Sequence, residues 1–94
     1  MSDNTDTING ISHAEVANAL QCAYDTALVR MQDARRTRGL PNHNQVREDQ
    51  FDRQFAEICQ AKLSFQSVTA DDIDSINRAK EWLDNYEEML SSTN

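Results

Sequence analysis

The chain has only two glycines and one proline in 94 residues, and this scarcity limits the possible folds more than any other feature. A β fold needs many turns, which Gly and Pro favour, so their scarcity indicates helices. One glycine and the only proline stand together in Gly39-Leu40-Pro41. Glycine at a left-handed cap followed by proline is a typical helix end. We therefore expect an all-α chain whose first long helix stops here.

The first helix has a marked start. Ser12 followed by Glu15 is a capping box, and Ile11 and Val16 on either side of it form a hydrophobic staple. Apolar side chains then recur at three- and four-residue steps: Val16, Leu20, Ala23, Ala27, Met31 and Ala34. This pattern predicts one apolar helix face.

Two further helices follow. Asn42 or Asn44 is the expected cap of the second helix, and Thr69 that of the third. The core stripe of the second helix holds Phe51, Phe55, Ile58 and Phe65, with Val46 at its start. The stripe of the third holds Ile76, Ala79, Leu83, Tyr86 and Leu90, with Ile73 at its edge.

The expected fold is all-α, a small antiparallel three-helix bundle with helices at about 12–38, 44–66 and 70–91. A chain of 94 residues makes one domain. We expect a flexible N-terminal arm at 1–11, a single helical domain at 12–91 and a frayed tail at 92–94.

Charge is unevenly distributed. Residues 70–90 carry seven acids against Arg78 and Lys80, so this segment supplies −5 of the net charge of −7. Direct binding to nucleic acid is therefore not expected. Residues 34–47 carry four arginines and no acid, and we expect Arg35, Arg36 and Arg38 to end a helix and pair with the chain's own acids. A basic partner protein suits this charge balance.

The third helix carries the candidate partner-binding acids. Asp74, Glu81 and Glu88 repeat every seven residues on one side of it, with Asp84 close by. They form either an ordinary solvated face or a strip that imitates phosphates for a partner's Lys and Arg. Asp71 and Asp72 belong to the same candidate set, although both also suit the dipole of a first helical turn.

Trp82 and Met89 lie seven residues apart on a shoulder of the same helix, beside the core stripe. They are either rim packing of a small bundle or an exposed anchor for a partner or a second copy.

No catalytic constellation is visible. His13 and His43 are isolated, the only cysteines are Cys22 and Cys59, and no metal-binding spacing occurs. We expect both cysteines to be buried free thiols. No catalytic residue, metal site or cofactor is predicted, and the chain is not expected to be an enzyme.

The N-terminal sequence lacks a basic, apolar signal peptide, and no run approaches the roughly 20 apolar residues of a membrane span. We expect a soluble, cytoplasmic protein with no membrane partner.

The stretch Ala70-Asp71-Asp72-Ile73-Asp74-Ser75-Ile76, followed by Glu81-Trp82-Leu83-Asp84, resembles an acidic segment of a phage-encoded anti-CRISPR protein. That inhibitor is among those acting on type I surveillance complexes. The likeness covers about fifteen residues and nothing before Ala70. It implies an inhibitor that presents carboxylates to a basic DNA-binding surface of a Cas complex. Asp71, Asp72, Asp74 and Asp84 would be the DNA-mimicking acids, with Glu81 as an equivalent.

The preferred hypothesis is a non-enzymatic inhibitor that blocks a basic nucleic-acid-binding surface in a bacterial cell. One alternative is a helical assembly or adaptor protein of a phage or bacterium that forms a homodimer through Trp82 and Met89. A second alternative is a small ligand-binding bundle or enzyme using Glu57, His13 or the cysteines.

Overall fold

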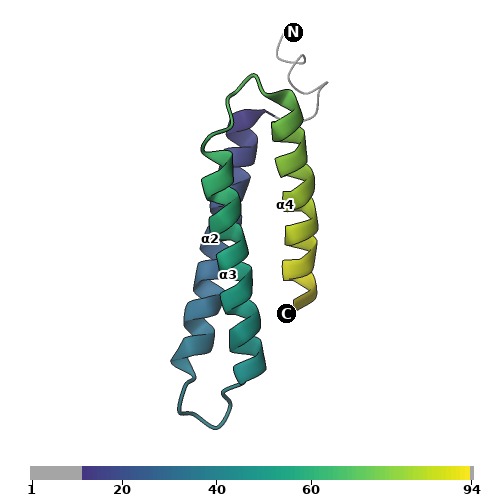
Figure 1. Cartoon of the computed structure of the whole chain (residues 1–94). Helices are drawn as coiled ribbons and strands as arrows, with labels where there is room; N and C mark the ends of the chain where they lie inside the picture. Colours follow the sequence, from purple (N-terminus) through teal and green to yellow (C-terminus); the bar gives the residue numbers. More distant parts are fainter. Residues whose placement is uncertain (1–11, 94) are drawn as a thin grey trace.

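The computed structural model describes residues 12–93 as an antiparallel bundle of three α-helices, with no strand in that range (Figure 1). The helices are α2 (His13–Arg36), α3 (Gln45–Phe65) and α4 (Ile73–Thr93). The all-α, three-helix prediction is therefore confirmed. The expected arm at 1–11, which includes the staple residue Ile11, lies outside the described residues, as does Asn94.

The predicted start of α2 rests on local hydrogen bonds that the structure contains, whereas the helix ends at Arg36, two residues before the predicted end at 38. Ser12 Oγ accepts from the Glu15 amide at 3.2 Å, and Glu15 Oε1 accepts from the Ser12 amide at 3.0 Å, which completes the capping box. After the helix ends, Gly39 has a φ of +84°, in the left-handed region that glycine tolerates. Thr37 Oγ1 donates to the Ala34 carbonyl at 2.8 Å, and this bond gives one of the last-turn carbonyls of α2 a hydrogen-bond donor.

Of the two candidate caps for α3, the structure selects Asn44, whose Oδ1 accepts from the Arg47 amide at 3.1 Å. The expected cap of α4, Thr69, is wrong. The amide of Asp72 donates to the Thr69 carbonyl at 3.1 Å, so residues 69–72 form a turn before the helix. Asp72 Oδ1 then accepts from the Ser75 amide at 3.3 Å and caps α4.

The end of α4 also differs from the expected boundary. The helix continues through Ser92 to Thr93, two residues beyond the predicted end, so these two residues are helical and not part of a frayed tail. Ser92 Oγ donates to the Glu88 carbonyl at 3.1 Å, which satisfies a carbonyl in the last turn.

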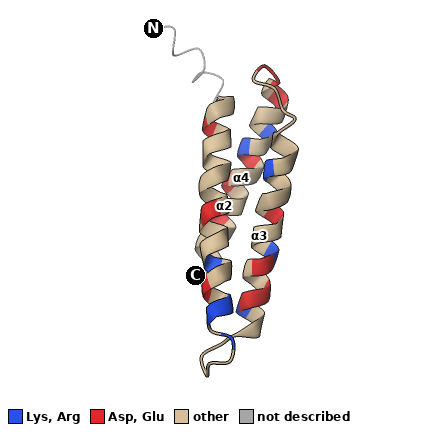
Figure 2. Ribbon diagram, turned by 90° about the vertical axis from the view of Figure 1, so that its left-hand side faces the viewer, with Lys and Arg blue, Asp and Glu red and all other residues tan. Residues whose placement is uncertain are grey.

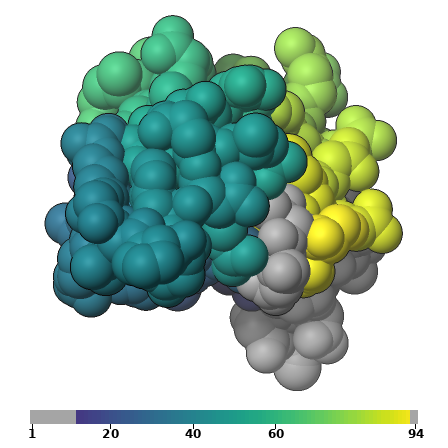
Figure 3. Space-filling view, turned by 90° about the horizontal axis from the view of Figure 1, so that it is seen from below, coloured from purple at the N-terminus to yellow at the C-terminus, as the bar shows by residue number. Residues whose placement is uncertain are grey.

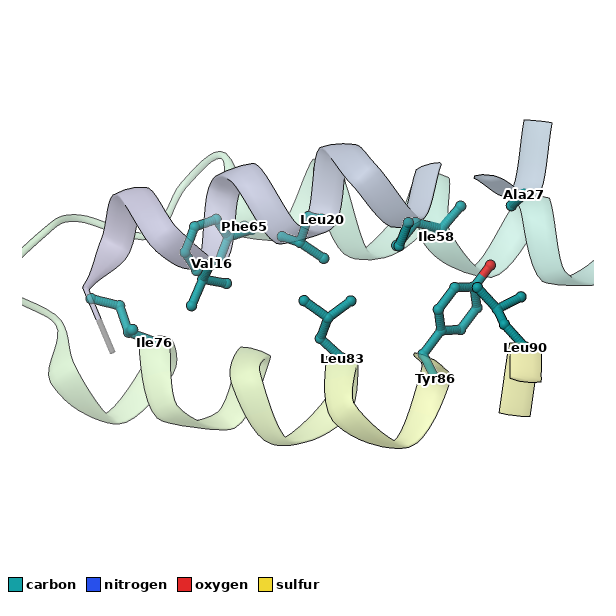
Figure 4. Close-up of a cluster of buried hydrophobic side chains, with 10 residues drawn as sticks. Val16, Leu20, Ala27, Ile58, Phe65, Ile76, Leu83, Tyr86 and Leu90 are labelled. Carbon is teal, nitrogen blue, oxygen red and sulfur yellow. The ribbon is translucent and has the colours of Figure 1, made fainter. Parts of the chain in front are cut away.

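One core runs along the inner faces of the three helices (Figure 4). Side chains of α4 point toward α2 and α3 in this view. The buried residues of this core are Val16, Leu20, Ala23, Ala27, Ile58, Phe65, Ile76, Leu83, Tyr86 and Leu90. Each large aliphatic side chain buried in this way contributes about 1.5–3 kcal/mol.

Five predicted core positions are less buried than expected, and one of them, Ala34 in the last turn of α2, is half-buried. Phe55 is half-buried, with its ring centroid 5.2 Å from that of Tyr24, because it lies on the α2 side of α3 and away from α4. Val46 is 69% exposed, since the first turn of α3 lies beyond the part of the bundle that α4 covers. Ile73 is exposed at the first position of α4, and Ala79 is half-buried.

The cysteine prediction is wrong. Cys22 is exposed and Cys59 is half-buried, so neither is a buried thiol. The cause is helical register, because Cys22 precedes the buried Ala23 and Cys59 follows the buried Ile58. A step of one residue turns a side chain by about 100° around the helix axis, away from the core.

The three helices are not packed equally. α2 and α3 pack closely along their length, α4 packs mainly on α2, and α3 and α4 make the weakest contact. The α2–α3 hairpin extends beyond the C-terminal end of α4 (Figure 1). Seen from below, the end of the hairpin stands in front and the yellow end of α4 lies beside it (Figure 3). A hydrogen bond links α2 to α4 close to the C-terminal end of α4. Arg30 Nη1 donates to the Leu90 carbonyl at 2.8 Å.

Candidate functional site: an acidic helix and the groove beside it

All six predicted partner-binding acids are exposed, and the structure divides them into two groups. Asp71 and Asp72 lie in the loop before α4 and take part in its start. Thr69 Oγ1 donates to Asp71 Oδ1 at 2.6 Å, and this hydrogen bond is the main reason that the pKa of Asp71 lies below its ordinary value. Asp72 is the helix cap. Both acids therefore have a structural role in addition to any role in binding.

The other four acids lie on α4 itself. Asp84 forms an ion pair with Lys80, with Oδ2 and Nζ 2.6 Å apart. Asp74, Glu81 and Glu88 form no ion pair within the described residues. They follow one another at intervals of seven residues, about 10.5 Å along the axis. We call these three residues the acidic strip.

In contrast to the acidic strip, the arginines at the end of α2 and in the following loop form ion pairs. Arg35 pairs with Asp52 at 3.1 Å, and Arg36 pairs with Asp33 at 2.8 Å. Arg38 pairs with Glu48. The expected internal ion pairs are confirmed, and Figure 2 shows basic positions (blue) gathered where α2 meets the hairpin loop. These three guanidinium groups form ion pairs within the protein, whereas the acidic strip forms none with any residue that the structure describes.

Sequence reasoning missed the network around Glu48, which is 1% exposed. Arg38 Nε donates to both carboxylate oxygens, at 3.0 and 3.1 Å, and His43 Nε2 donates to Oε1 at 2.9 Å. These hydrogen bonds, first from Arg38 and then from His43, lower the pKa of Glu48 to about 2, against the opposing effect of burial. The network fixes the Arg38–His43 loop onto the start of α3. The only sequence signal was the shared occurrence of Arg38, His43 and Glu48 within eleven residues.

His13 is likewise structural. Its Nε2 donates to the Val68 carbonyl at 2.9 Å, and its ring stacks on Phe65 with centroids 4.6 Å apart. These contacts tie the start of α2 to the loop after α3. Among the described residues, no group of three or more His, Cys, Asp or Glu side chains is placed to hold a metal ion.

Trp82 and Met89 line a groove between α3 and α4. Trp82 is 37% exposed as a residue, and its ring stacks on that of Tyr86, with centroids 4.9 Å apart. The groove has a volume of about 640 Å³. Its walls include Glu57, Ala61 and Ser64 from α3, and Trp82, Asn85 and Met89 from α4. The sequence pointed to the shoulder of α4 but not to the facing wall on α3.

The sequence matches no protein-family model and no curated protein, and the structure matches no solved structure. None of the helices in residues 12–93 contains a stretch that is both long and apolar enough to cross a membrane.

Proposed function

We propose that this protein is a non-enzymatic inhibitor that occupies a basic nucleic-acid-binding surface of another protein through the outward face of α4. The observation that carries the proposal is the acidic strip, Asp74, Glu81 and Glu88, which is exposed and forms no ion pair within the described residues. Carboxylates at this spacing present charge to Lys and Arg side chains as phosphates do. The protein then competes with nucleic acid both by charge and by volume.

The partner we propose is a Cas surveillance complex of type I in the cytoplasm of a bacterial host, with the protein acting as a phage-encoded anti-CRISPR. This finer proposal is supported by the resemblance of residues 70–84 to an inhibitor of such complexes. It would also explain why residues 70–90, the end of the loop and most of α4, supply −5 of the net charge of −7.

The experiment is a competition between this protein and labelled target DNA for a purified type I surveillance complex. Wild-type protein displaces the DNA, and displacement weakens steeply as salt rises, because exposed charges are screened within about 8–10 Å at physiological ionic strength. The test variant carries Asp74→Lys, Glu81→Lys and Glu88→Lys, and we expect it to lose displacement while keeping its helicity.

A matched control separates the position of the charges from their number. The control carries Asp25→Lys, Asp49→Lys and Glu87→Lys, three exposed acids outside the strip. Both variants have the same net charge, so a field effect alone would weaken them equally. Equal displacement by wild type and strip variant, or a ternary complex with DNA, would contradict the proposal.

A second candidate function is self-association into a helical assembly. The observation in its favour is the groove beside Trp82 and Met89, since an apolar surface with an exposed Trp suits an interface between copies. Light scattering tests it, because a stable oligomer in which Trp82 is shielded from water is expected only under this candidate.

A further inference from the structure

The groove between α3 and α4 has the form of an unfilled helix position. Both helices pack on α2 but make little contact with each other, so no element of residues 12–93 covers this side of the bundle. Its surface includes the apolar side chains of Leu20, Ala61, Phe65 and Ala79, with the indole of Trp82 on one wall. This apolar surface forms a channel along two helices rather than an isolated patch.

The two walls have helical spacing. On α4, Ser75, Trp82 and Met89 recur at seven-residue steps, and on α3, Glu57, Ala61 and Ser64 recur at four- and three-residue steps. Rows of this spacing are the ridges between which a neighbouring helix packs in a four-helix bundle. The small side chains of Ala61 and Ser64 leave room on the α3 side for the occupant's larger side chains. The shape therefore suits one α-helix with an apolar face.

Charge around the groove selects the kind of helix. Glu57 stands on the α3 wall, and its charge contributes to raising the pKa of Tyr86, after burial. The acidic strip lies beside the α4 wall of the groove, because Glu81 immediately precedes Trp82 and Glu88 immediately precedes Met89. Arg78 is the one cation among the residues lining the groove in the described part of the chain. A second copy would bring its own acidic strip to the same place, where like charges repel.

We propose that the groove binds a single amphipathic helix of a partner protein, apolar on one face and rich in Lys or Arg on both flanks of that face. The helix lies along α3 and α4, its apolar side chains contact Trp82 and Met89, and its basic flanks meet Glu57 on one side and Glu81 on the other. The proposal goes beyond the proposed function and does not depend on competition with nucleic acid.

The probe is a synthetic peptide of about 18 residues, long enough for a helix of about 27 Å, built from Leu and Lys in amphipathic order. A peptide of the same composition in shuffled order, without an apolar face, controls for charge alone. Trp82 is the only tryptophan of the chain, so its emission reports directly on the groove. We expect saturable binding of the amphipathic peptide with a blue shift of the Trp82 emission, and no such shift with the shuffled peptide.

Variants locate the binding surface. Ser64→Arg places a large cation in the groove from an exposed wall position, and Ser64→Phe fills the groove without adding charge or a second tryptophan. We expect each to weaken peptide binding by about tenfold or more. Leu63→Arg is the matched control, since Leu63 is the preceding residue, is 61% exposed and does not line the groove. Glu57→Lys should weaken binding more than Glu87→Lys.

Each outcome decides the proposal. Equal binding of the amphipathic and shuffled peptides, or unchanged binding in both Ser64 variants with helicity retained, would overturn it. A stable dimer with Trp82 shielded in the absence of peptide would assign the groove to a second copy and also overturn it. The peptide assay contains no nucleic acid, so its result tests only the groove. The DNA competition tests only the proposed function, and the two proposals can therefore fail independently.

Discussion

The hydroxyl of Tyr86 donates a hydrogen bond to the backbone carbonyl of Gln54, with the two oxygens 2.5 Å apart. Tyr86 belongs to α4 and Gln54 to α3, so this bond joins the two helices that otherwise meet least. The pKa of Tyr86 is raised, first by burial and then by the charges of Glu57 and Cys59. The neutral phenol that donates this bond is therefore the form that the fold stabilises.

Replacing Tyr86 by Phe removes the donor and keeps the ring. We expect the free energy of unfolding to fall by about 1 kcal/mol, the usual net value of one hydrogen bond. Urea unfolding measures it, with Tyr24→Phe as the control. In wild type, the contribution of Tyr86 to stability is fully present below the ordinary pKa of 10.0 and is lost as the pH rises above it, because the folded pKa is higher. A Tyr86→Phe variant that matches wild type at neutral and alkaline pH would contradict this account.

Glu48 predicts sensitivity to acid. Its folded pKa of about 2 lies below its ordinary value of 4.5, so its contribution to stability is present above about pH 4.5 and is lost as the pH falls toward 2. We expect the urea midpoint of wild type to fall through this window. Glu48→Gln should lower stability at neutral pH and flatten the change with pH, whereas Asp49→Asn, at an exposed neighbour, should keep the wild-type slope.

The reassigned cap of α4 is testable by two alanine substitutions. Asp72→Ala removes the side chain that accepts from the Ser75 amide, and we expect a loss of about 1 kcal/mol. Thr69→Ala removes only the hydrogen bond to Asp71, so its effect should be smaller. Thermal unfolding followed by circular dichroism compares them. A larger loss of stability for Thr69→Ala than for Asp72→Ala would contradict this assignment and restore Thr69 as the cap.

The core assignment on α3 gives a further comparison. Ile58 is completely buried, and Ile58→Ala should cost about 2–5 kcal/mol. Domains of this size have about 5–15 kcal/mol in total, so the variant should be close to unfolding. Phe55→Ala should cost less than truncation of a fully buried ring, since Phe55 is only half-buried. Leu63→Ala, at an exposed position, should stay within about 0.5 kcal/mol of wild type. Equal losses of stability in Ile58→Ala and Leu63→Ala would mean that α3 does not bury the face that carries Ile58.

Helix number and most helix ends were predictable because they depend on local chemistry. Ser12 and Glu15 satisfy each other's amides within one turn, and Gly39 supplies the left-handed residue after α2. The start of α4 was harder to predict, because Thr69 and Asp72 are both good caps and the turn between them decided the choice.

The features that sequence missed depend on how the helices are placed in space. A charged residue in the first turn of a helix is usually solvated, and Glu48 is buried only because the loop brings Arg38 and His43 over it. The α3 wall of the groove has no periodic apolar signal, since Ala61 and Ser64 are small and Glu57 is charged. The acidic strip was visible in the sequence, and its function stays a prediction.

The weak contact between α3 and α4 has a consequence for the order in which the molecule opens. Detachment of α4 breaks its packing on α2 and few contacts with α3, while the α2–α3 hairpin keeps its own interface. Such a helix behaves as a separate cooperative unit, and its amide protons exchange with solvent before those in the centre of the hairpin. A ligand that bridges α3 and α4 would slow this exchange most strongly in α4, far beyond the residues it touches.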